Sequence, residues 1–165
     1  MGGFLRATFS FPHPVNEYAA RTVAAMVVTL SLVAIVLNIP WLLIVLTYGF
    51  LARVLTGPKL SPMGLLATRV IVPLMGDPYK PVAGPPKRFA QSVGLAFSTA
   101  SLLLFYVAGA PVAAYSVLGV LTLFAGLEAF VGFCAGCFVF NLLMRAGVIP
   151  ESVCRDCNDL SFQRV

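Results

Sequence analysis

Two long stretches of the chain contain no charged residue, and they dominate the pattern of apolar and polar positions. One covers residues 22–52 and the other residues 89–127. As single straight helices they would be roughly 46 Å and 58 Å long, whereas the hydrocarbon core of a bilayer is about 30 Å thick. Each stretch has helix-ending residues near its middle, Asn38-Ile39-Pro40 and Gly109-Ala110-Pro111. The pattern therefore predicts two helical hairpins.

The predicted fold is all-α, an integral membrane four-helix bundle in a single domain over residues 1–165. Its helices are expected at about 17–38, 40–55, 89–108 and 112–143. The connection over 56–88 is rich in Gly and Pro, and Ser61-Pro62 is typical of a helix start. The apolar segment that follows is too short to span, so we expect a short helix lying in the membrane interface.

The basic residues lie on one side of this four-helix scheme. Two precede or begin the first helix, six fall between residues 53 and 88, and three lie near the C-terminus, while the two hairpin tips have none. Basic loops stay in the cytoplasm. The distribution predicts a plasma-membrane protein with both termini, the connection 56–88 and the tail 147–165 on the cytosolic side.

The composition agrees with insertion in a lipid bilayer. The chain is 59% hydrophobic and only 10% charged, whereas soluble domains are about 25% charged. This excludes an ordinary soluble enzyme, a disordered tail and a protein that binds nucleic acid through a basic surface. The basic connection is expected to contact anionic lipid headgroups, or alternatively to hold a substrate or partner.

Glu128 is the one acidic residue in the interior of a predicted span, since Glu17 stands at the first position of its helix. A carboxylate at that depth is costly unless it is protonated, paired or facing water. We expect it to face inward, with Arg53 or Arg88 as its partner. Two roles remain open, a structural ion pair and the handling of a proton or ligand.

The four cysteines form two C-x-x-C pairs, Cys134/Cys137 and Cys154/Cys157. If the tail folds back, all four sulfur atoms can meet at the cytosolic face. This spacing is typical of tetrahedral zinc or iron–thiolate sites, and it equally suits two redox dithiols. The cytosol is reducing, so a permanent structural disulfide is not expected. Metal binding, thiol redox or sulfur relay, and simple burial stay open as alternatives.

On a continuous helix Glu128 and Cys134 would lie on different faces, and contact between them would need a break at Gly132.

Several stretches together resemble a bacterial family of integral membrane proteins, the DUF4395 family. They are 11–21, 57–62, 82–91 and 127–137, the last of which holds the Cys-Ala-Gly-Cys pair. The resemblance implies a multi-pass membrane protein and an association with thioredoxin-like and sulfurtransferase proteins. It implies no established activity.

Three functional hypotheses follow. In the first, the four cysteines exchange disulfides or persulfides with a cytosolic thioredoxin-like or sulfurtransferase partner. In the second, they hold zinc or iron in a non-enzymatic membrane protein. In the third, Glu128 and the basic loop line a path for a small anion or a sulfur compound, which would require a homo-oligomer because four helices enclose only a thin pore.

Overall fold

The computed structural model describes residues 13–150 and Val153, and nearly all regular structure within them is helical. Four stretches are long and apolar enough to cross a membrane. They are α2 (Glu17–Val36), α3 (Trp41–Thr56) with the 3-10 turn Gly57–Lys59, α6 (Gly84–Tyr106), and α7 (Pro111–Gly126) with the π-helical turn Leu127–Val131. The prediction of a helical protein with four candidate membrane spans is confirmed for this part of the chain.

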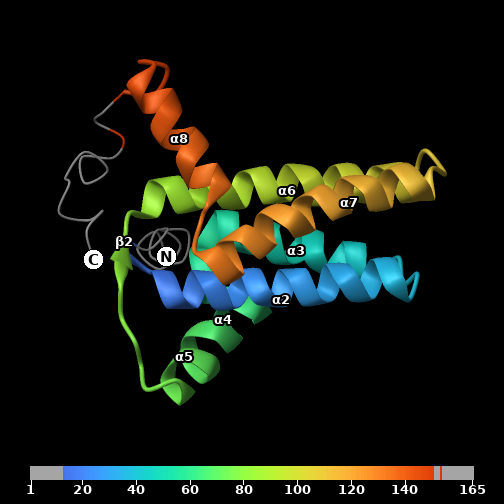
Figure 1. Cartoon of the computed structure of the whole chain (residues 1–165). Coiled ribbons are helices and arrows are strands. Elements are labelled where there is room, and N and C mark those ends of the chain that lie inside the picture. The colour runs from blue at the N-terminus through green and yellow to red at the C-terminus, as the bar shows by residue number, and fades with distance from the viewer. Residues whose placement is uncertain (1–12, 151–152, 154–165) are drawn as a thin grey trace, which may run out of the picture.

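The four long helices lie alongside one another in a bundle (Figure 1). Helix α6 packs against α3 and α7, and α2 packs against α7 and α3. The turns at residues 37–40 and 107–110 lie at the same end of the bundle (Figure 1). Asn38 and Gly109 both have positive φ there, and Tyr115 donates a hydrogen bond to Asn38 at 2.7 Å. The helices therefore end at the residues that the sequence marks as breakers.

Small and apolar side chains fill the middle of the bundle. Ser31, Ser98 and Ser101 are fully buried, and small residues of this kind let helices approach closely in a membrane. Ser101 donates to the carbonyl of Ala114 at 2.8 Å, which links α6 to α7. The apolar core comprises Val27, Ala34, Leu42, Leu43, Leu46, Phe50, Met63, Leu118, Leu121 and Ala125.

The opposite end of the bundle carries the connections. Strand β1 (Val15–Asn16) pairs antiparallel with β2 (Pro81–Val82), which ties the start of α2 to the start of α6. Between them, α4 (Pro62–Leu66), a π-helical turn (Ala67–Ile71) and α5 (Val72–Leu74) form one short apolar helical run. The hydroxyl of Ser61 caps this run by accepting from the Gly64 amide at 3.3 Å. The expected short helix is present, and its place in a membrane interface stays a prediction.

The fourth predicted helix, 112–143, is wrong as a single helix. The chain leaves the helical conformation at Gly132, which has φ +78°, and restarts as α8 (Ala135–Arg145). Helix α8 then leaves the bundle at a steep angle (Figure 1). An unbroken helix of that length would be about 48 Å and would exceed the bilayer. The left-handed backbone at Gly132 is accessible to glycine without a Cβ penalty.

This break predicts opposite effects for two alanine substitutions. Gly132→Ala is expected to lower the free energy of unfolding by about 1–2 kcal/mol, because alanine resists positive φ. Gly126→Ala is the matched control, since a Cβ there meets nothing within 4 Å, and it is expected to stabilise the helix by about 0.5–1 kcal/mol. Denaturant titration of the protein in detergent micelles measures both changes. Two variants with the same sign of change would contradict the assignment of the break to Gly132.

Candidate functional site

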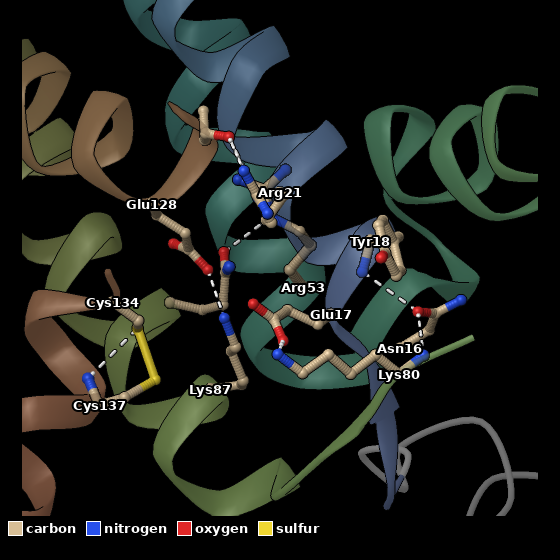
Figure 2. Close-up of polar contacts among 12 residues, drawn as sticks. Asn16, Glu17, Tyr18, Arg21, Arg53, Lys80, Lys87, Glu128, Cys134 and Cys137 are labelled. Atoms are coloured by element: carbon tan, nitrogen blue, oxygen red, sulfur yellow. Dashed lines mark hydrogen bonds and ion pairs between the residues drawn. A yellow bond between two sulfur atoms is a disulfide. The ribbon is translucent and has the colours of Figure 1, made fainter. Parts of the chain in front are cut away.

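The Cys134/Cys137 pair stands at the beginning of α8. Cys134 is the N-cap residue, and its Sγ accepts a hydrogen bond from the Cys137 amide at 3.3 Å. The two sulfur atoms are joined as a disulfide with a Cα–Cα distance of 5.2 Å (Figure 2), a separation usual for such bonds. In the reduced form, the positive end of the helix dipole and this amide stabilise a thiolate at Cys134.

Gly136, between the two cysteines, lets α8 lie directly on α6. A Cβ atom at Gly136 would be 2.6 Å from the Cα of Ala90, too close for any side chain. Small residues of this kind let two helices approach closely. Gly136 has that role, whereas Gly132, four residues earlier, breaks the helix.

The carbonyl groups released by the break at Gly132 have partners. The amide of Gly132 donates a hydrogen bond to the carbonyl of Glu128, and the amide of Phe133 donates one to the carbonyl of Leu127. Arg21 donates to the carbonyls of Ala129, at 3.1 and 3.2 Å, and Phe130, at 3.1 Å. A cation at the C-terminal end of a helix also matches the helix dipole. Arg21 thus stabilises the break that presents Cys134.

Glu128 pairs with Lys87, and the N–O distance is 2.6 Å. The two side chains are only 14% and 9% exposed, and Figure 2 shows the ammonium group directed at the carboxylate. The sequence predicts Arg53 or Arg88 as the partner of Glu128, whereas the residue that forms the ion pair in the structure is Lys87. Arg88 donates instead to the carbonyl of Val54 at 3.0 Å. Lys87 and Arg88 are adjacent, so about 100° of helix rotation separates them and only one faces inward.

Arg53 lies close by as a buried cation that forms no salt bridge with any described residue. Its Nε donates to Gln91 at 2.8 Å, and its Nη1 donates to the hydroxyl of Ser61 at 3.3 Å. The guanidinium group lies 4.5 Å from the centre of the Phe50 ring. The Nη2 group is buried and has no hydrogen-bond partner among the described residues. One strong donor group of the site is therefore left unused.

These side chains border a cavity of about 220 Å³ between α2, α3, α6, α7 and α8. Its polar border consists of Arg53, Gln91, Glu128 and Cys134, and the rest of its wall is mostly apolar and aromatic. A second cavity of similar volume lies on the other side of Arg53 and Gln91 and is bordered by Lys87. The break at Gly132 thus brings Glu128 and Cys134, which a continuous helix would separate, to one cavity.

Sequence reasoning found four of the residues at this site, Arg53, Glu128, Cys134 and Cys137. Cys154 and Cys157 lie outside the described residues, so their approach to Cys134 stays a prediction. Among the residues that the structure describes, no group of three or more His, Cys, Asp or Glu side chains is placed to hold a metal ion.

Arg21, Lys87 and Gln91 were missed. The sequence does contain a signal for Lys87 and Gln91. Polar and small residues recur at helical spacing along one face of α6, which indicates that this face packs against other helices. The residues of that face are Lys87, Gln91, Gly94, Ser98 and Ser101.

Comparison with known proteins identifies the family. The profile of a domain of unknown function, DUF4395, matches residues 15–145. The chain belongs to the DUF4395 family. The DUF4395 match includes the bundle and the Cys134/Cys137 pair and ends before Cys154. Searches of curated proteins and of solved structures find no match.

The buried ion pair predicts a large difference between two lysine substitutions. Lys87→Met leaves Glu128 unpaired and is expected to cost about 3–5 kcal/mol of unfolding free energy. Lys80→Met is the control, because Lys80 is 34% exposed in its 3.0 Å pair with Glu17, and exposed pairs contribute at most about 1 kcal/mol. The double variant Lys87→Met/Glu128→Gln should recover much of the loss. Equal losses for Lys87→Met and Lys80→Met would contradict a buried pair.

Proposed function

We propose that this protein is a plasma-membrane thiol–disulfide relay in which Cys134 and Cys137 are the reactive pair. The observation that carries the proposal is the position of the two sulfur atoms at the start of α8, within bonding distance of each other and with Cys134 at the border of a cavity. Both termini and the connection between α3 and α6 face the cytosol in this proposal, as the positive-inside rule requires. The pair then stands at the cytosolic membrane boundary.

The electron donor is a cytosolic dithiol protein of thioredoxin-like or sulfurtransferase type. Its thiolate attacks the Sγ of Cys137, because Cys134 is the sulfur that borders the cavity. The Cys134–Cys137 bond breaks, and Cys134 leaves as a thiolate at the N-cap, where the helix dipole stabilises it. The second thiol of the donor then resolves the mixed disulfide. The donor ends as a disulfide, and Cys134 and Cys137 end as a dithiol.

The tail pair Cys154/Cys157 serves in this proposal as an intermediate carrier between the donor and Cys137. The DUF4395 match ends before the tail, so the core reaction is assigned to Cys134/Cys137 alone. Basic side chains at the same end of the bundle favour thiolates over thiols.

Thiol counting and trapping on one double variant test the proposal. The full-length protein in lipid nanodiscs is equilibrated with mixtures of reduced and oxidised thioredoxin and then labelled with a maleimide polymer. The Cys154→Ser/Cys157→Ser variant is expected to lose and regain two thiols together at one midpoint. A thioredoxin that lacks its second, resolving cysteine should attack the oxidised Cys154→Ser/Cys157→Ser protein and stay bound to it through Cys137, with Cys134 released as a free thiol. Peptide mapping identifies the sulfur that forms the mixed disulfide, and attachment at Cys134 would contradict the proposed direction of attack.

The zinc or iron alternative gives a different result in the same samples. A metal site predicts about one metal ion per chain in the wild type, lost in both the Cys134→Ser/Cys137→Ser and the Cys154→Ser/Cys157→Ser variants. Elemental analysis measures this ratio. That outcome, with thiols that do not respond to thioredoxin, would reject the relay.

A further inference from the structure

We propose that the cavity beside Cys134 binds the head group of a lipid-soluble quinone, which oxidises the Cys134/Cys137 dithiol. This inference rests on the proposed thiol function and names the electron acceptor. A relay that receives electrons from the cytosol needs such an acceptor, and the acceptor must reach the sulfur that borders the cavity.

The position and lining of the cavity favour a ligand that is mostly apolar. The wall is formed by the spanning helices and by α8, and it includes four phenylalanines. The cavity extends from Cys134 and Arg53, at the end of the bundle that carries the connections, to Val27, Phe97 and Leu121, which lie well inside α2, α6 and α7. A ligand with a polar head and an apolar remainder fits this distribution.

The size of the cavity suits a single substituted ring. A cavity of about 150 Å³ lined by apolar side chains already binds benzene, and this cavity measures about 220 Å³. Aromatic side chains such as Phe50 and Phe89 favour stacked or edge-on contact with a planar ring.

Arg53 provides the specific polar contact. The residue is 4% exposed and borders the cavity, and its Nη2 has no hydrogen-bond partner within the part of the chain that the structure describes. A buried donor of this kind is costly unless a ligand accepts its hydrogen bond. A quinone carbonyl oxygen accepts one, and negative charge that develops on that oxygen during reduction is stabilised by the guanidinium group. A lipid acyl chain has no acceptor to offer, and an inorganic anion would leave the apolar length of the cavity unfilled.

The reaction balances without a further reactant. The two S–H bonds of Cys134 and Cys137 are lost and one S–S bond forms. The two electrons released reduce the quinone, and the two protons complete the O–H bonds of the quinol. The regenerated disulfide then accepts the next pair of electrons from the cytosolic dithiol.

A quinone-reduction assay tests the inference. The full-length protein in nanodiscs is reduced, freed of reductant and mixed with decylubiquinone or menadione, and quinol formation is followed by absorbance and thiol loss by maleimide labelling. One quinol is expected for each Cys134–Cys137 disulfide. Arg53→Gln should slow the reaction at least tenfold, whereas Arg88→Gln, whose arginine does not border this cavity, should not.

A second pair of variants compares a substitution that fills the cavity with one that does not. Val139→Trp adds bulk from a cavity-lining residue that is 44% exposed, and it should slow quinone reduction at least tenfold. Val112→Trp, at a position 80% exposed and away from the cavity, should leave the rate unchanged.

The outcomes separate the two proposals. A dithiol that exchanges with thioredoxin but does not reduce either quinone overturns the inference and leaves the thiol function in place. Equal quinone rates in the wild type, Arg53→Gln and Val139→Trp overturn it as well, because the reaction then occurs outside the cavity. Protection of Cys134 against an alkylating reagent can also be measured with each ligand present. If thiosulfate protects Cys134, the quinones do not, and the protection is lost in Arg53→Gln, the cavity binds an anion and the inference is overturned. Loss of exchange with thioredoxin in the wild type would remove both proposals.

Discussion

The structure of the site depends on satisfying the backbone where the last spanning helix breaks at Gly132. In a hydrocarbon environment an unpaired carbonyl costs several kcal/mol, so a helix can end there only if its last carbonyls find donors. Two backbone amides and the guanidinium group of Arg21 provide those donors. The break is therefore compatible with a position inside the bilayer boundary. Its consequence is a new helix N-terminus, with Cys134 as its cap, next to the bundle interior.

The charged side chains around this break differ in how far their charges are balanced by neighbouring groups. Lys87 and Glu128 neutralise each other, and Arg21 is used by backbone carbonyls. Arg53 forms no salt bridge with a described residue. Gln91, Ser61 and the face of the Phe50 ring contact its guanidinium group, and the carboxylate of Glu128 also interacts with its charge. A bundle that needed Arg53 only for packing would gain by replacing it with an apolar residue. The buried cation and Cys134 border the same cavity, and the proposed ligand site rests on this arrangement.

Most of the fold was accessible from the pattern of apolar residues, because membrane insertion imposes strong limits on helix length and charge. The four spans, the two turns and the capping serine before α4 follow from local sequence. The sequence predicts one continuous helix over 112–143, because a single glycine in an apolar run is also compatible with a packed helix. Whether glycine ends a helix depends on the availability of donors for the freed carbonyls, and those come from Arg21, more than a hundred residues away in sequence.

The sequence by itself determined that this chain is helical with four candidate membrane spans, that the turns within its two long apolar stretches carry no basic residue and that its cysteines occur in pairs. Those properties follow from composition and from short-range spacing. Only the tertiary structure decided that Lys87 pairs with Glu128, that Arg53 keeps an unused donor and that Cys134 borders a cavity. Each of these depends on how far the helices are rotated about their axes. That rotation is set by close contacts such as Gly136 against Ala90 and Gly94 against Phe50, which no single segment encodes.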